Sequence, residues 1–161
     1  MIELYSGIYE IPDFLTDQEL TLLNEYVNGV SESDWFAKNS HGMFIEVDRP
    51  DVQEALEAYR SRVQAMFFGH GVLPIKRITR ISQGKKMDGH TDLGEPRCVH
   101  GVVLYLNDDF VGGELHYKDI GVRYKPRAGS IIVHEAKYFH EVLPVESGVR
   151  YSATTFVWKS V

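Results

Sequence analysis

The sequence predicts a mainly β fold with N-terminal helices, on the basis of two observations. Apolar residues recur at helical spacing before residue 70, whereas short apolar runs separated by turn residues follow from Ile75 onward. No helix-length pattern lies between the late strands, so the spacing favours a sandwich or barrel such as a jelly roll over parallel βαβ units. We expect one domain over residues 1–161, with a helical cover over 13–70 and a jelly-roll core over 75–159.

Two amphipathic helices are expected in the first part of the chain. Thr16 and Glu19 have the spacing of a capping box, with Thr16 as the N-cap, and Gly29 can end the first helix. The second helix is expected to begin near Pro50, which suits a first turn, and to close at Gly69. The apolar positions that define the two faces are Leu20, Leu23, Tyr26 and Val27, then Val52, Leu56, Tyr59, Val63 and Met66.

The β-rich part is expected to contain six strands, each bounded by turn residues such as Gly84 and Gly129. The expected strands span residues 75–81, 99–106, 114–117, 122–124, 130–134 and 151–158. The segment from Trp35 to Val47 is expected to be a loop that can act as a lid, because long loops beside sites often close over them.

Composition excludes several classes of function. The formal net charge of −6 argues against electrostatic capture of nucleic acid, which favours a basic surface. The single cysteine, Cys98, rules out an internal disulfide and is compatible with a reducing compartment. No signal peptide and no membrane-spanning apolar run is recognised, so we expect a cytoplasmic protein without membrane association.

The chemistry-bearing residues begin with His90 and Asp92. Side chains two apart on a strand point to the same face, so the pair can reach one ion if this stretch is extended. The pair alone is a weak signal, since a solvated turn is the more common explanation of such a pair. His140 strengthens it, because a histidine in an apolar strand needs a partner. Two imidazoles and one carboxylate are the ligand set of non-haem Fe(II) oxygenases.

Arg150 and Ser152 add a second element to the predicted site. They lie two residues apart where the expected strand over 151–158 begins, so they share a face if the chain is already extended at Arg150. A guanidinium forms paired hydrogen bonds with a carboxylate, so the two side chains could hold one end of a dicarboxylate whose other end binds the metal. The alternative is a surface arginine of the common kind.

The remaining candidates have simpler interpretations. His134 is the nearest rival to His140 as a metal ligand, but it lies sixteen residues before Arg150, whereas His140 lies ten residues before it. His100 and His116 are interpreted as structural, His41 and His70 as solvated, and Cys98 as a small buried residue. The basic residues Lys76, Arg77, Arg80, Lys85 and Lys86 could attract an acidic substrate or form a solvated face.

Several short blocks follow one another in a fixed order. They are Gly84, His90-Thr91-Asp92, Val102 to Asn107, Gly112 to Leu115, Ala128-Gly129-Ser130, His140-Glu141-Val142 with Pro144-Val145, and Gly148 to Ser152. With this spacing, the region from about Ile75 to Lys159 resembles the Fe(II)/2-oxoglutarate dioxygenases of the prolyl 4-hydroxylase type, especially the small bacterial and phage hydroxylases. That family folds as a double-stranded β-helix, or jelly roll.

The resemblance implies roles for individual residues. His90, Asp92 and His140 match the iron ligands, and Arg150 and Ser152 match residues that bind the distal carboxylate of 2-oxoglutarate. Two further residues match the cosubstrate pocket of relatives. Tyr105 matches a tyrosine that hydrogen-bonds the same carboxylate in some relatives, and Leu115 matches an apolar residue that lines the pocket. One departure from the family is Ile81, which stands where a tyrosine is common.

The implied activity is oxidative decarboxylation of 2-oxoglutarate to succinate, coupled to C–H hydroxylation of a prolyl peptide or an amino acid. Fe(II) and 2-oxoglutarate are the implied cofactors, with ascorbate as a further candidate, and the partners are dioxygen and a peptide or small molecule. The runner-up is a nucleic-acid demethylase of the same superfamily, but those enzymes carry a second arginine where Phe156 stands here. A non-catalytic jelly-roll module that binds a metal is the other alternative.

Overall fold

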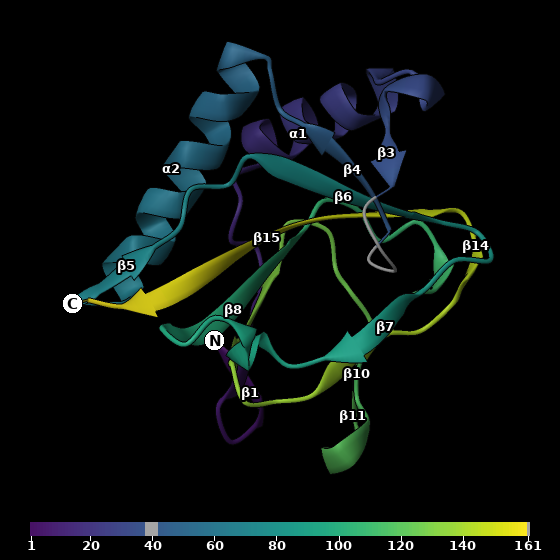
Figure 1. The fold of residues 1–161 in the computed structure, drawn as a ribbon. Helices are drawn as coiled ribbons and strands as arrows, with labels where there is room; N and C mark the ends of the chain where they lie inside the picture. The colour runs from purple at the N-terminus through teal and green to yellow at the C-terminus, as the bar shows by residue number, and fades with distance from the viewer. Residues whose placement is uncertain (38–41, 161) are drawn as a thin grey trace.

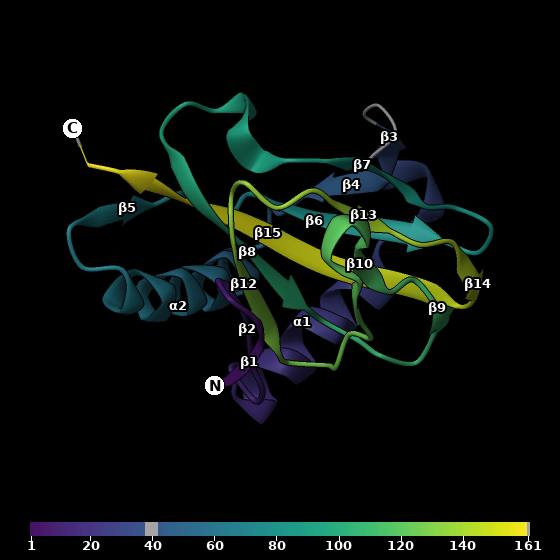
Figure 2. The ribbon, with the colours of Figure 1, turned by 90° about the horizontal axis from the view of Figure 1, so that it is seen from below.

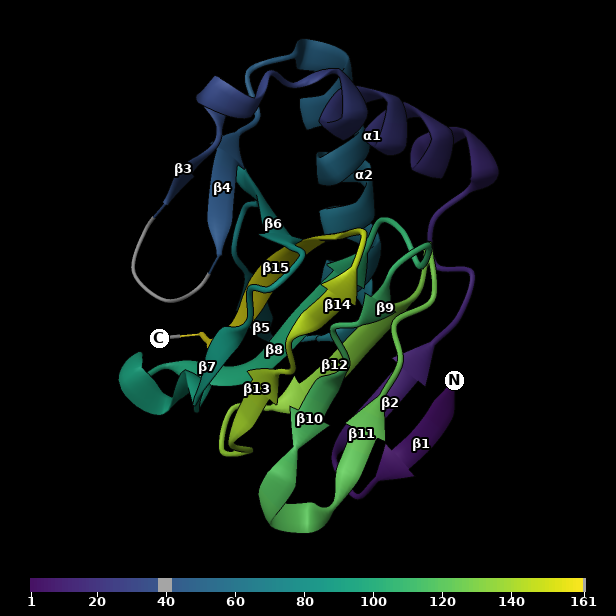
Figure 3. The same cartoon turned by 90° about the vertical axis from the view of Figure 1, so that its right-hand side faces the viewer.

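The computed structural model describes residues 1–37 and 42–160 as two helices packed on a β-sandwich. Helix α1 spans Asp17–Gly29 and α2 spans Pro50–Met66. Both lie on one side of the large sheet (Figure 1), and the small sheet lies on the other (Figure 3). This is the mainly β, jelly-roll architecture that the sequence predicts.

The large sheet has the order β1-β2-β12-β8-β15-β6-β4-β3, with β5 paired to β15. Its strands are β1 (Ile2–Tyr5), β2 (Ile8–Ile11), β3 (Phe36–Ala37), β4 (Met43–Glu46), β5 (His70–Val72), β6 (Arg77–Ser82), β8 (Cys98–Tyr105), β12 (Ile131–Glu135) and β15 (Val149–Lys159). The long strand β15 crosses the middle of this sheet (Figure 2) and carries part of the predicted site.

The small sheet has the order β11-β10-β13-β7, and a separate pair joins β14 to β9. The strands are β7 (Met87–His90), β9 (Val111–Gly112), β10 (Leu115–Tyr117), β11 (Val122–Tyr124), β13 (His140–Val142) and β14 (Val145–Ser147). Short 3-10 turns occur at Glu32–Asp34, Asp92–Gly94 and Lys118–Ile120. All the strand pairs are antiparallel, as expected for hairpin-connected strands without helical crossovers.

Side-chain alternation along β8 divides the interior into two cores. Val102 and Leu104 pack toward the helices, together with Leu23 of α1 and Tyr59 of α2. The next residues along the strand, Val103 and Tyr105, face the small sheet and pack with Leu115, Tyr117 and Val142. Period-two alternation therefore gives the large sheet one face against the helices and one face inside the sandwich, where the predicted site residues lie.

The predicted capping box is present at the start of α1. The Glu19 amide donates to the Thr16 hydroxyl at 3.1 Å, and the Thr16 amide donates to the Glu19 carboxylate at 3.0 Å. The end of α2 was predicted too late: the helix stops at Met66, and the Phe67 amide turns back to the Gln64 carbonyl. Gly69, expected to close the helix, lies in the turn that leads to β5.

The expected loop from Trp35 to Val47 is corrected by the structure. Met43–Glu46 forms β4, which pairs with β6, and Phe36–Ala37 forms β3, which pairs with β4. Three apolar residues follow one another in Met43–Glu46 without alternation, so the segment was interpreted as a loop. Residues 38–41, which include His41 and the tip of the proposed lid, lie outside the described residues.

Candidate metal centre and cosubstrate pocket

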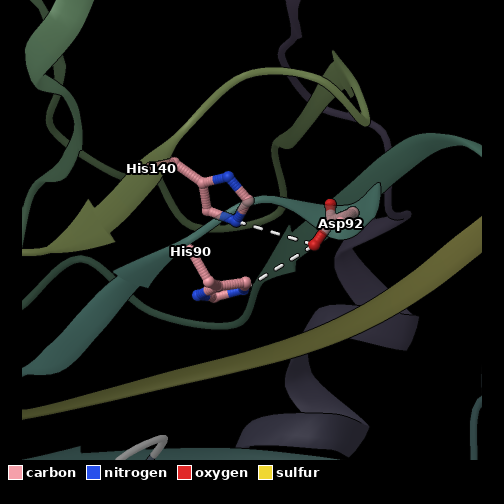
Figure 4. A group of neighbouring side chains, drawn as sticks. All are labelled: His90, Asp92 and His140. Carbon is pink, nitrogen blue, oxygen red and sulfur yellow. Dashed lines mark ion pairs between the residues drawn. The ribbon is translucent and has the colours of Figure 1, made fainter. Parts of the chain in front are cut away.

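The pairing of β7 with β13 brings the two predicted ligand histidines together. His90 and His140 are direct partners in this antiparallel pair, and their ring centroids lie 4.5 Å apart. Asp92 begins the 3-10 turn that follows β7, so its carboxylate folds back toward the two imidazoles (Figure 4). One ligand atom from each of the three residues lies within 4.8 Å of the others.

The hydrogen bonds of the two rings leave the correct nitrogens facing the group. His90 Nδ1 lies 3.1 Å from the Asp88 carbonyl oxygen, and His140 Nδ1 lies 2.9 Å from that of Tyr138. A carbonyl oxygen accepts only, so each Nδ1 carries the proton and each Nε2 presents a lone pair. The Asp92 Oδ1 atom is 3.6 Å from His90 Nε2 and 3.9 Å from His140 Nε2.

Electrostatics keep the group ready to bind a cation at neutral pH. Burial, together with the neighbouring His134, lowers the pKa of His140 to about 4, so its ring is neutral. Burial raises the pKa of Asp92, but the hydrogen bond from His134 and the nearby imidazoles outweigh it and leave the pKa below its usual value. Two neutral nitrogens and one carboxylate are the donor set expected of a non-haem Fe(II) site, so the residues fit that metal.

A cavity of about 580 Å³ opens beside this group. Seven of the residues that line it alternate along two strands: three lie on one face of β6 and four on one face of β15, as period-two alternation requires. The lining also includes all but one of the predicted site residues, namely His90, Asp92, Leu115, His140, Arg150 and Ser152. The cavity therefore joins the metal-ligand group to the predicted carboxylate-binding residues.

Arg150 is buried beside the cavity without an acidic partner. Its side chain is 2% exposed, Nε donates to the Gly113 carbonyl at 3.1 Å, and one terminal nitrogen donates to Ser152 Oγ at 3.1 Å. No carboxylate among residues 1–37 and 42–160 forms an ion pair with it. Burial lowers the pKa of the guanidinium, because removing a charge from water costs free energy. An anion bound in the cavity would offset that cost.

Tyr105 is the predicted site residue that does not line the cavity. Its ring lies beneath the guanidinium, with Arg150 Cζ 5.0 Å from the ring centroid. Its hydroxyl is buried, and no hydrogen-bond partner for it occurs in the described part of the chain. Burial raises the pKa of this hydroxyl, so it remains protonated and is available as a donor.

His134 was missed as a neighbour of the metal-ligand group. It is 1% exposed, and its Nε2 lies 2.9 Å from Asp92 Oδ2, although it is not one of the three residues whose ligand atoms converge. The predicted strand over 130–134 could have indicated this position. His134 lies two residues after Ile132, so both side chains share the face of β12 that points into the sandwich.

The other candidates take up structural roles. His116 is 2.9 Å from the Glu141 carboxylate, and His100 packs against Phe67 with ring centroids 5.0 Å apart. Cys98 is buried, which raises its pKa to about 11 and keeps it a thiol. Within the basic group, ion pairs form between Arg77 and Glu46, Arg80 and Glu32, and Lys86 and Asp88.

Fold and site together define a class of protein, and comparison with known families identifies it. The profile of the 2OG-Fe(II) oxygenase superfamily matches residues 76–158, which is half of the chain. The chain therefore belongs to the 2OG-Fe(II) oxygenase superfamily and is a 2-oxoglutarate-dependent dioxygenase. Fe(II) and 2-oxoglutarate are the metal and cosubstrate of this family.

Individual relatives agree with this assignment. The chain is 27% identical to a PKHD-type hydroxylase of Methylobacterium nodulans, over 94% of this chain and 77% of that protein. Its fold is similar to that of a viral collagen prolyl hydroxylase from Paramecium Bursaria Chlorella virus-1, with a TM-score of 0.76, 17% identity, and coverage of 96% and 97% of the two chains. A Pseudomonas putida prolyl-4-hydroxylase gives a TM-score of 0.74 at 21% identity, covering 96% and 94%.

Among the described residues, no helix has both the length and the apolar composition needed to cross a bilayer.

Proposed function

We propose that this dioxygenase hydroxylates a prolyl residue of a peptide, or a related amino acid, with His90, Asp92 and His140 as its iron ligands. The observation that carries the proposal is the convergence of these three side chains in one cavity with a buried Arg150, which has no ion-pair partner among residues 1–37 and 42–160. A metal site on one side of the cavity and a fixed positive charge on the other suit a cosubstrate with a chelating end and a carboxylate end.

The metal would be held by the Nε2 atoms of His90 and His140 and by Asp92 Oδ1. Bound Fe(II) supplies the activation of dioxygen, and the balanced reaction is 2-oxoglutarate plus dioxygen plus R–H giving succinate, carbon dioxide and R–OH. The backbone carbonyls behind the two rings fix the tautomers, so neither histidine must lose a proton when the metal binds.

The distal carboxylate of 2-oxoglutarate would bind at Arg150 and Ser152. Arg150 Nε and one terminal nitrogen already have partners, which orients the guanidinium and leaves its remaining hydrogens for the ligand. Leu115, Val103 and Ile81 form apolar walls of the cavity and exclude water from this end. In a dry pocket the ion pair is stronger than it would be in water.

The substrate class rests on the relatives, two of which are named as prolyl hydroxylases. Phe156 lines the cavity at the position where nucleic-acid demethylases of the superfamily carry a second arginine, so the chain lacks this feature of that alternative. Cytoplasmic location and a requirement for ascorbate stay predictions.

The proposal is tested with Fe(II), 2-oxoglutarate and panels of prolyl peptides and free amino acids, each examined for a mass gain of one oxygen atom. Succinate should form in step with the product, and His140→Ala should abolish both. Product from the His140→Ala protein at the wild-type rate would refute the site. Succinate formation without any oxidised proline compound would refute the substrate class while leaving the cosubstrate chemistry intact.

A further inference from the structure

The two oxygens of the Asp92 carboxylate have different surroundings. Oδ1 is the atom nearest to both ligand histidines, at 3.6 Å from His90 Nε2 and 3.9 Å from His140 Nε2. Oδ2 instead lies 2.9 Å from Nε2 of His134, on strand β12 of the large sheet. One oxygen is thus directed to the metal site, and the other is held by a side chain outside it.

The direction of this hydrogen bond follows from its partners. An ionised carboxylate accepts only, so His134 Nε2 must carry a hydrogen and donate a hydrogen bond to Asp92. The other ring nitrogen, Nδ1, lies 2.7 Å from the Tyr117 hydroxyl. When Nε2 alone carries the ring hydrogen, Nδ1 accepts; Tyr117 then donates to His134, and this bond favours the tautomer that donates to Asp92.

The Tyr117–His134–Asp92 chain is shielded from solvent. Tyr117 is 0% exposed and His134 is 1% exposed, and they lie on opposite sheets of the sandwich. Because water has little access to either bond, the two side chains hold the carboxylate against rotation. The metal-ligand group is therefore connected to both sheets and not only to the β7–β13 pair.

A glycine on β8 leaves the space that the hydrogen bond between His134 and Asp92 needs. Gly101 is the direct partner of His134 in the β8–β12 pair. A Cβ atom at Gly101 would lie 2.5 Å from Asp92 Oδ2 and 2.5 Å from His134 Nε2. Both approaches are far inside van der Waals contact, so any side chain there would separate the imidazole from the carboxylate. Glycine at 101 is thus a steric requirement of the hydrogen bond.

We propose that His134 is a positioning residue that occupies Asp92 Oδ2 and so makes Asp92 a one-oxygen ligand, with Tyr117 setting the tautomer and Gly101 providing the space. The proposal rests on the proposed metal site. With Oδ2 engaged, only Oδ1 can bind the metal, and a further coordination position is left for cosubstrate or dioxygen. Loss of the bond would free the carboxylate to rotate or to chelate through both oxygens.

The test is Co(II) binding to the purified protein without cosubstrate or turnover, measured by calorimetry and by the d–d absorption, whose intensity reports coordination number. His134→Phe keeps a buried ring but removes both nitrogens. We expect its Co(II) affinity to fall roughly 10- to 100-fold, the usual effect of losing a residue that orients a ligand. Its absorption should also change in shape, because the carboxylate is no longer restricted to one oxygen.

Three comparisons separate positioning from a general loss of structure. His134→Gln places an amide donor near the Nε2 position and should restore most of the affinity. Gly101→Ala should reproduce the His134→Phe spectrum with the imidazole still present. The matched control is His100→Phe, which changes a half-buried histidine on the adjacent strand β8 that does not contact Asp92, and its affinity should equal that of the wild type.

Co(II) affinity and absorption of His134→Phe within twofold of the wild type would overturn the proposal. An equal loss in His134→Gln and His134→Phe, with circular dichroism showing both folded, would overturn it too, because a donor at this position would then be irrelevant. A wild-type protein that binds Co(II) no better than His140→Ala would instead overturn the proposed metal site, and the positioning role with it.

Discussion

Replacement of Arg150 by methionine tests whether the buried guanidinium binds the cosubstrate. Methionine is unbranched and flexible, so it can occupy most of the space of the arginine stem without its charge. In the free protein the guanidinium is buried, and its polar partners are the Gly113 carbonyl and the Ser152 hydroxyl, with no carboxylate among the described residues. The substitution should therefore act strongly on ligand binding and only weakly on the stability of the free protein.

The effect on binding is the larger one. Without Arg150, the distal carboxylate of 2-oxoglutarate would be stranded in an apolar pocket, and breaking a buried ion pair in this way costs about 3–5 kcal/mol. At roughly 1.4 kcal/mol per tenfold change, the affinity should fall on the order of 10²–10³-fold. The free protein, by contrast, loses two hydrogen bonds worth about 1.5–3 kcal/mol each but no longer buries an unpaired charge, a penalty of several kcal/mol. Its stability should therefore change little.

The assay is calorimetric titration of 2-oxoglutarate into Mn(II)-loaded protein, which binds the cosubstrate without turnover, together with thermal unfolding of the free protein. Arg150→Lys keeps the charge but not the paired donors, so its affinity should lie between those of Arg150→Met and the wild type. Arg127→Met is the matched control, since that arginine pairs with Glu10 and does not line the cavity.

Two results would contradict this reasoning. Wild-type affinity for 2-oxoglutarate in Arg150→Met would show that the guanidinium does not bind the distal carboxylate. A large drop in the unfolding temperature of the free protein would show that Arg150 contributes mainly to folding, and that its burial without an acidic partner is not a cost offset by a bound anion.

Three further predictions concern other parts of the molecule. Tyr105→Phe removes a buried hydroxyl that has no hydrogen-bond partner within the described part of the chain. The 2-oxoglutarate affinity should therefore fall roughly 10- to 100-fold in calorimetry, while urea unfolding of the free protein is unchanged; a large loss of stability would contradict this. Gly89→Ala places a Cβ atom 2.2 Å from the ring of Phe139, so this ring or the backbone must move. Because Gly89 and Phe139 directly precede His90 and His140, the Mn(II) affinity should drop at least tenfold. Unchanged affinity would show that the ring moves without displacing the ligands. Thr16→Ala breaks the capping box with Glu19 and should lower the free energy of unfolding by about 1 kcal/mol in urea, without altering metal affinity.

The local features of the fold could be predicted from the sequence because each depends on residues close together in the chain. The capping box of α1 needs only Thr16 and Glu19, and it is present as expected. Side-chain alternation placed Arg150 and Ser152 on one face of β15, where both are buried and hydrogen-bonded to each other. The last two strands of the large sheet, β3 and β4, were missed, because their residues show no alternation of apolar and polar side chains in the sequence.

The sequence by itself predicted the candidate site residues and the shared strand face of Arg150 and Ser152. It also paired His90 with Asp92 on an extended stretch, whereas Asp92 begins a 3-10 turn after β7. Only the tertiary structure decided that β13 lies beside β7 with His140 opposite His90, and that β12 directs His134 to the second oxygen of Asp92. The physical reason is that the side-chain period of a strand is set by local backbone geometry. Strand order and register depend instead on how segments distant in the sequence bury their apolar faces together. They also depend on close approaches that only a glycine permits, such as the one at Gly101.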